Sequence, residues 1–98
     1  RMRWYRATYN QTSGKYTKAA PIKVITERLG AIVSTNKHGA AVAFQGKFTS
    51  TEAIRPGSYV IGEDGQIMQP YTVDRRGGMS GIYTYMLTEQ GFIKGSNG

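Results

Sequence analysis

The fold class follows from the stretch SYVIGEDGQIM, residues 58–68. Two short runs of β-branched and other apolar residues, 58–61 and 66–68, flank the turn Gly62-Glu63-Asp64-Gly65. An Asp-Gly pair between such runs is a strong hairpin signal, because both residues tolerate the backbone angles of tight turns and the Asp carboxylate can bond the turn's own backbone. The stretch therefore predicts two antiparallel strands joined by a tight turn.

The same pattern recurs along the rest of the chain. Thirteen of the 98 residues are glycine, nearly double ordinary usage, and they separate short β-prone runs. The other runs are 2–9, 15–18, 31–35, 40–48, 71–73, 82–87 and 92–94, and the turn Asn36-Lys37-His38-Gly39 predicts a second hairpin. Short strands with turns every 8–12 residues predict a mainly β fold. We expect a small single-domain barrel or sandwich of short antiparallel strands over residues 1–94, followed by a flexible tail at 95–98.

Residues 21–29 admit two interpretations. A short helix is favoured by Pro21, which suits a first helical position, by apolar residues at helical spacing, and by Gly30, which suits a C-terminal cap. A strand is favoured by β-branched residues that alternate along the segment, namely Ile22, Val24 and Thr26.

Composition narrows the class of protein. Cysteine is absent, which excludes disulfides and thiolate metal sites. Apolar runs are only a few residues long, whereas a membrane-spanning helix needs roughly 20, so no transmembrane segment is expected. Arginines at positions 1, 3 and 6 interrupt the start of the chain, which does not resemble a signal peptide. The lack of cysteine and of a signal peptide favours an intracellular location.

The chain offers few groups for catalysis. The single histidine, His38, lies in a predicted turn and cannot form a metal site by itself. Glu63 and Asp64 are adjacent in a turn, where their side chains diverge. No phosphate-binding loop, dinucleotide fingerprint or zinc pattern occurs. We therefore predict that the protein is not an enzyme, with no catalytic residues, no metal site and no cofactor.

Positive charge is concentrated in the first part of the chain. The net charge is +7. Residues 1–60 hold ten basic and two acidic residues, a net charge of +8, whereas residues 61–98 hold three basic and four acidic residues, a net charge of −1. A field of one sign favours a polyanionic partner and salt-sensitive association. The alternative is that these charges only keep the domain soluble.

Basic and aromatic residues alternate near the N-terminus. Pairing of 2–9 with 15–18 would place Arg3, Tyr5 and Tyr9 on one face near Tyr16. Such a surface can stack bases on tyrosine rings while cations contact phosphates. The predicted nucleic-acid-binding residues are Arg3, Tyr5, Arg6, Tyr9, Lys15, Tyr16 and Lys18, extended by Lys37, Lys47 and Arg55 near strand ends and by Arg75 and Arg76 on a glycine-rich loop.

Each of these features also has a structural interpretation. The arginine loop is equally typical of an exposed hairpin tip with solvated charges. Trp4 is expected in the core, because a small β domain needs its one tryptophan inside. Tyr83 and Tyr85 share a face and are either packed at the edge of the core or part of a second aromatic stripe.

Two hypotheses of different classes follow. The first is a nucleic-acid-binding module of low sequence specificity, with single strands favoured over duplexes because no clear recognition helix is present; DNA and RNA are not distinguished. The alternative is a protein-interaction or assembly module that forms a homo-oligomer or binds another protein through a strand edge. Its basis is the small core, the many glycines and the tyrosines, which are enriched at protein interfaces.

Overall fold

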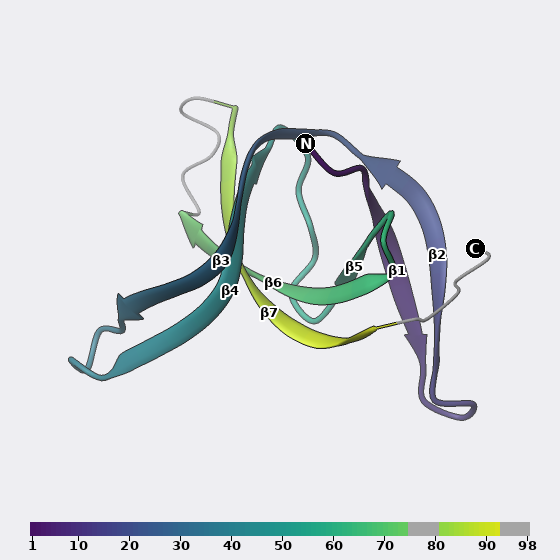
Figure 1. Cartoon of the computed structure of the whole chain (residues 1–98), viewed down its shortest axis with the longest axis horizontal. Coiled ribbons are helices and arrows are strands. Elements are labelled where there is room, and N and C mark those ends of the chain that lie inside the picture. Colours follow the sequence, from purple (N-terminus) through teal and green to yellow (C-terminus); the bar gives the residue numbers. More distant parts are fainter. Residues whose placement is uncertain (75–80, 93–98) are drawn as a thin grey trace.

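The computed structural model describes residues 1–74 and 81–92 and confirms a mainly β fold (Figure 1). In this part of the chain, seven strands form one antiparallel sheet and no residue is helical. The strands are β1 (Trp4–Asn10), β2 (Lys15–Ile22), β3 (Val24–Thr35), β4 (Ala41–Ser50), β5 (Tyr59–Gly62), β6 (Gln66–Asp74) and β7 (Tyr83–Phe92). No candidate membrane-spanning helix is found within these ranges. The predicted tail at 95–98 lies outside the described residues.

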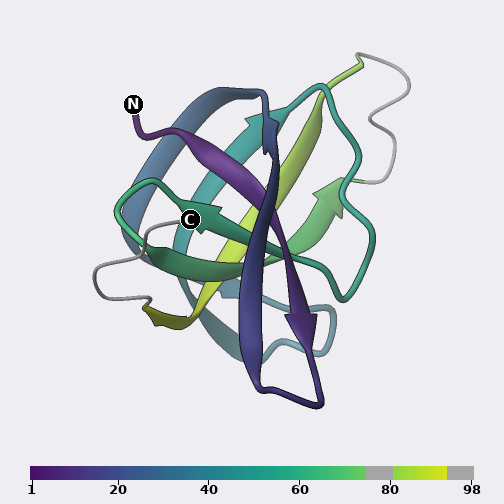
Figure 2. The same cartoon turned by 90° about the vertical axis from the view of Figure 1, so that its right-hand side faces the viewer.

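The sheet is curled, and its two edge strands are consecutive in the sequence. Its strand order is β2-β1-β5-β6-β7-β4-β3, so that β2 and β3 are the opposite edges although only Lys23 separates them in sequence. Figures 1 and 2 show this continuous segment passing from one edge of the sheet to the other. Among the described residues, no backbone ladder joins β2 to β3, so the sheet is curled like a barrel but not closed.

The helix considered for residues 21–29 is wrong, and the segment is extended throughout. Residues 21–22 end β2 and residues 24–29 begin β3. Its β-branched side chains favour strands because their χ1 angles are restricted in helices. Pro21 is accommodated because it lies on an edge strand beside an irregularity in the β1–β2 register.

Two strands are longer than the sequence pattern indicates. β6 continues through Pro70, which lies between the runs 66–68 and 71–73, and β7 continues through residues 88–91, which lie between the runs 82–87 and 92–94. Beyond Met68, β6 pairs only with β7, so Pro70 interrupts no second ladder. Pairing across the sheet, with Gln69 opposite Thr88, therefore overrides the local turn preference.

The two predicted turns are present. Gly65 donates its N–H to the carbonyl of Gly62 at 2.9 Å and has a φ of +94°, which favours glycine. Asp64 accepts a hydrogen bond from the N–H of Gln66 at 2.9 Å. In the β3–β4 turn, the Asn36 side chain accepts bonds from two backbone N–H groups of the same turn.

The core fills the inside of the curled sheet. Trp4 is buried, as expected, and its ring meets Phe48 edge-on at 5.5 Å between centroids. Phe48 also contacts Tyr85, with ring centroids 5.9 Å apart. Tyr83 packs against this cluster, so Tyr83 and Tyr85 belong to the core and its edge. The buried members are Trp4, Ile22, Phe48, Ile54, Val60, Met68, Tyr85 and Leu87.

Replacement of Phe48 by alanine should strongly destabilise the fold. The fully buried ring lies between Trp4 and Tyr85, so its removal leaves a cavity, and the free energy of unfolding should fall by about 3–5 kcal/mol. Urea unfolding followed by circular dichroism measures this change. The matched control is Val73→Ala, at a side chain that is 60% exposed, which should change stability by less than about 0.5 kcal/mol. Equal effects of the two substitutions would contradict this description of the core.

Candidate nucleic-acid interface

Tyrosines gather on the outer face of the sheet over β1, β2 and β5. Along β1, Tyr5, Ala7 and Tyr9 alternate with residues that point to the inside of the curl. Tyr9 is paired with Tyr16 on β2, and Ala7 is paired with Tyr59 on β5. Figure 2 shows β1 and β2 side by side on this side of the molecule. We call this surface the tyrosine face, defined by Tyr5, Tyr9, Tyr16, Lys18 and Tyr59.

The tyrosine face covers a small core of its own. Ala7, Ile61 and Ile67 are buried on this outer side of the sheet, and Tyr5, Tyr16 and Tyr59 pack against them. β5 therefore has apolar residues on both faces, since its Val60 belongs to the inner core. These rings already have a structural role, and any ligand must bind to what they leave exposed.

The rings are packed mainly against one another. The centroid of Tyr16 lies 4.7 Å from that of Tyr9 and 5.1 Å from that of Tyr59, in tilted and edge-on geometry. Burial first, and then the neighbouring hydroxyls of Tyr59 and Tyr9, raise the pKa of Tyr16, so its phenol stays protonated at neutral pH. Tyr9 is the most exposed of the set, at 42%. Tyr9 is therefore the ring of this face that is most accessible to a ligand.

Cations adjoin these rings. The Lys18 ammonium lies 4.5 Å from the centroid of the Tyr5 ring, in cation–π contact. Lys15 is exposed at the tip of the same hairpin, on the side of β2 opposite to Tyr16, because successive residues of a strand point to opposite faces. Arg3 is exposed too, and its backbone is tied by hydrogen bonds in both directions to Glu63.

The carboxylates, in contrast, are occupied by other groups of the chain. Most of their partners are backbone N–H groups or neutral side chains, and not lysine or arginine. Hydrogen bonds are accepted by Glu27 from Trp4 and Met2, by Glu52 from Arg6 and Lys23, by Glu63 from Arg3, by Asp64 from Gln66 and by Glu89 from Gln66. Among the described side chains, those of residues 1–73 and 81–91, the only ion pair joins Arg6 to Glu52. The excess positive charge of these ranges is therefore left un-neutralised at the surface.

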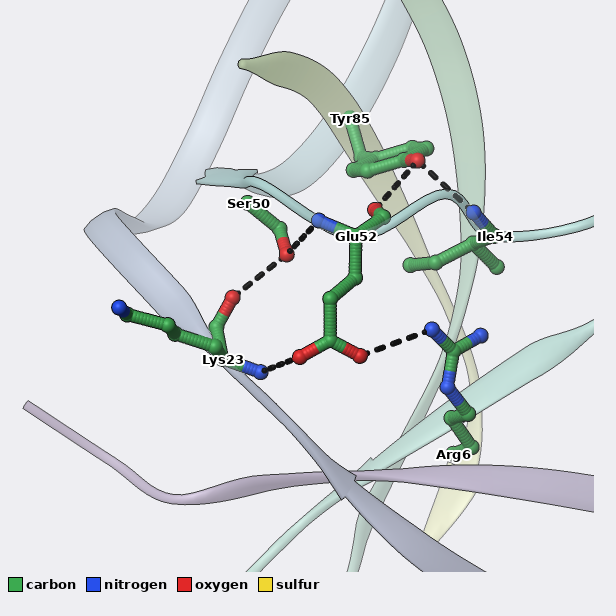
Figure 3. Close-up of polar contacts among 6 residues, drawn as sticks. All are labelled: Arg6, Lys23, Ser50, Glu52, Ile54 and Tyr85. Carbon is green, nitrogen blue, oxygen red and sulfur yellow. Dashed lines mark hydrogen bonds and ion pairs between the residues drawn. The ribbon is translucent and has the colours of Figure 1, made fainter. Parts of the chain in front are cut away.

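Arg6 does not belong to the tyrosine face. Arg6 lies on β1, is paired with Val60 of β5 and points to the inner side of the sheet. There, its guanidinium lies 3.0 Å from the Glu52 carboxylate. The same carboxylate accepts a hydrogen bond from the backbone N–H of Lys23 at 3.0 Å (Figure 3). That backbone bond first, and then the bond from Arg6, lower the pKa of Glu52. Arg6 is thus part of the closure of the sheet.

Tyr85 and Ser50 complete this closure. The Tyr85 hydroxyl donates to the carbonyl of Glu52 at 3.0 Å and accepts from the N–H of Ile54 at 2.8 Å. The Ser50 hydroxyl donates to the carbonyl of Lys23 at 2.5 Å. Figure 3 shows these bonds meeting where the β4–β5 connection faces the bend at Lys23.

The remaining predicted binding residues are scattered. Lys37 is exposed in the β3–β4 turn, Lys47 is exposed on β4 opposite Arg28, and Arg55 is exposed in the β4–β5 connection. Arg75 and Arg76 lie outside the described residues. The structure thus brings Tyr5, Tyr9, Tyr16 and Lys18 to one face. Arg3 and Lys15 lie at the two ends of the same hairpin, and the other predicted residues are separate from it.

The sequence analysis does not predict Tyr59 as a member of this surface. Its contact with Tyr9 and Tyr16 arises from pairing of β5 with β1, which are about fifty residues apart in the chain. The available signal was the uninterrupted apolar run at 59–61, because such a run is typical of a strand covered on both faces.

The described residues contain no group of three or more His, Asp or Glu side chains that could hold a metal ion. His38 is exposed in its turn. Comparison with protein-family models, with curated proteins and with solved structures finds no match. The functional assignment therefore depends on the surfaces described above.

Replacement of Glu52 by glutamine should reduce stability in a pH-dependent way. Because folding lowers the pKa of Glu52, its ionised form stabilises the fold above the ordinary glutamate pKa of about 4.5, and this contribution is lost as pH falls through the lowered value. Its side chain is 39% exposed, so the ion pair should contribute at most roughly 1 kcal/mol. Urea midpoints of the two proteins should differ at pH 7 and converge as the pH falls below the lowered pKa of Glu52. A difference independent of pH would contradict the role of the carboxylate charge.

Proposed function

We propose that this protein binds nucleic acid through the tyrosine face and the cations beside it. The observation that carries the proposal is the Lys18 ammonium over the Tyr5 ring of a tyrosine-rich outer face, with Lys15 exposed at the tip of the same hairpin and Arg3 exposed at its other end. Un-neutralised cations attract phosphates and release counterions on binding, which supplies affinity without base recognition. Low sequence specificity follows, because phosphate contacts carry no sequence information directly.

Single strands are the favoured ligand. No described residue is helical, so this part of the chain contains no recognition helix that could enter a major groove. An exposed tyrosine ring such as Tyr9 can stack only on a base that is not already stacked in a duplex. The tight packing of Tyr16 and Tyr59 limits stacking, so phosphate contacts supply most of the affinity.

Self-association is a second candidate function, favoured by the β3–β4 arm, which we define as residues 29–45. Strand β4 pairs with β7 only from Gly46 onward, so the arm is a two-stranded hairpin that projects beyond the barrel (Figure 1). Such a hairpin is at best marginally stable by itself in water. Lys37 is its only charged residue, and Val33 is 72% exposed.

The outer edge of β3 offers a place for a second copy of the chain. β3 pairs with β4 on one side only, and beyond an irregularity between Leu29 and Ile32 its regular part, 32–35, is uncharged. Exposed and uncharged strand edges pair readily with other strands. We therefore propose edge-to-edge pairing of two arms as the mode of self-association.

The double substitution Lys15→Ala and Lys18→Ala should weaken nucleic-acid binding and reduce its salt dependence. Each phosphate contact to a single strand contributes about 0.7 to the slope of log K against log salt, so loss of two contacts should lower the slope by roughly 1.4. Fluorescence anisotropy with a labelled single-stranded oligonucleotide, titrated at several salt concentrations, measures both quantities. The matched control is Lys37→Ala and Lys47→Ala, which removes the same charge away from the tyrosine face. Absence of binding by the unmodified protein at low salt would refute the proposal, and equal losses in both double variants would refute the location.

The substitution Val33→Lys should abolish self-association. It adds a charge at the centre of the arm, where pairing of two copies would bring two such charges together. Sedimentation velocity over a wide concentration range should show dimers for the unmodified protein and monomers for the variant. The control is Ser13→Lys, which adds the same charge in the exposed β1–β2 turn and should leave association unchanged. A strict monomer at every concentration would exclude this function.

A further inference from the structure

A hollow opens beside the exposed end of the tyrosine face. It lies between the last part of β1 and the residues that precede and begin β5, and its volume is about 300 Å³. Volumes of small-molecule sites begin at roughly this value. The hollow is thus suited to one compact ligand.

Aromatic rings form part of its lining. Tyr9 and Tyr59 both border the hollow, and their centroids lie 6.2 Å apart with the rings tilted by 56°. This separation leaves no room for another ring between them, so a ligand must approach from the side of the hollow. Tyr9, the most exposed ring of the tyrosine face, presents the larger surface there.

Unpaired backbone groups border the same hollow. β1 pairs with β5 only from Trp4 to Ala7, whereas Thr8 and Tyr9 pair only with β2. The N–H and C=O groups of this short stretch that point away from β2 therefore have no strand partner. Because successive residues of a strand direct these groups to opposite sides, they amount to the N–H and the C=O of one residue, beside an aromatic ring.

Polar side chains also border the hollow. Gln11 and Ser58 line the hollow, and neither side chain makes a hydrogen bond within the part of the chain that the structure describes. An amide and a hydroxyl each donate and accept hydrogen bonds. Gly57, with a φ of +84°, completes the wall without a side chain.

From this combination we infer that the hollow receives one unpaired nucleobase. A nucleobase is planar, has a π face for Tyr9 and carries donors and acceptors at its edge for Gln11, Ser58 and the β1 backbone. This inference rests on the proposed nucleic-acid binding and deepens it, since phosphate contacts at Lys15 and Lys18 hold the strand while the hollow takes one of its bases. A fully paired duplex cannot supply such a base without opening.

Oligonucleotides with and without bases test the inference. A labelled thymidine oligomer is compared with the same oligomer in which every base is removed, so that both carry the same phosphate charges. The unmodified full chain should bind the intact oligomer about 5- to 150-fold more tightly, the range that corresponds to stacking of one base. Equal affinities with a steep salt dependence would overturn the inference and leave the proposed function standing. Failure of both oligomers to bind at low salt would overturn the proposed function itself.

Variants locate the effect. Tyr9→Ala should remove most of the preference for the intact oligomer without a change in the salt slope, and Gln11→Ala with Ser58→Ala should reduce it. The matched control is Tyr71→Ala, at a tyrosine of β6 that is 45% exposed and does not border the hollow, and its preference should remain. Circular dichroism of each variant confirms that it is folded. Retention of the full preference in both Tyr9→Ala and the double variant would place the base elsewhere and refute the site.

Discussion

The fold depends on how the opposite edges of one curled sheet are held together without a backbone ladder between them. The Glu52 carboxylate accepts a hydrogen bond from the backbone at the bend, Lys23, and pairs with Arg6 on β1. Ser50 and Tyr85 bond the same bend and the same connection. Side chains therefore do at this point what strand pairing does elsewhere in the sheet. These side-chain bonds matter because a small domain without disulfides has few other means of stabilising its core.

This use of carboxylates also shapes the surface. Glu27 satisfies the indole N–H of the buried Trp4, and Glu63 satisfies the backbone N–H of Arg3. A buried donor without a partner would cost roughly 1–3 kcal/mol, so Glu27 contributes more at the indole of Trp4 than it would in an exposed ion pair. The result is that most lysines and arginines of the described ranges make no ion pair. The basic surface is thus a consequence of the way the fold satisfies its own donors, as well as of composition.

Much of this fold could be predicted from the sequence, since Asp64-Gly65 and Asn36 to Gly39 specify turns locally. The convergence of Tyr5, Tyr9 and Tyr16 also followed from one local hairpin. What could not be predicted arises from contacts between distant segments. Pairing of β1 with β5 brings Tyr59 to the tyrosine face, and the pairing of β6 with β7 extends both strands through expected breaks. The sequence of residues 21–29 is ambiguous because its apolar residues fit both helical spacing and the alternation of a strand. Pairing of this segment at the two edges of the sheet makes it extended. Arg6 was assigned to the surface because a single strand does not reveal which of its faces is enclosed.

The bend at Lys23 connects the two candidate surfaces physically. The segment before it, β2, carries Tyr16 and Lys18 of the tyrosine face, and the segment after it, β3, carries the projecting arm. Because the bend sends these halves to opposite edges of the sheet, the proposed contact with a strand of nucleic acid and the proposed contact between two copies use separate surfaces. Self-association would then add the positive charges of two tyrosine faces without covering either. Two linked sites bind a long polyanion more tightly than one, since the second contact becomes intramolecular. The two functions are therefore compatible, and the geometry of this single bend determines how far apart the two faces lie.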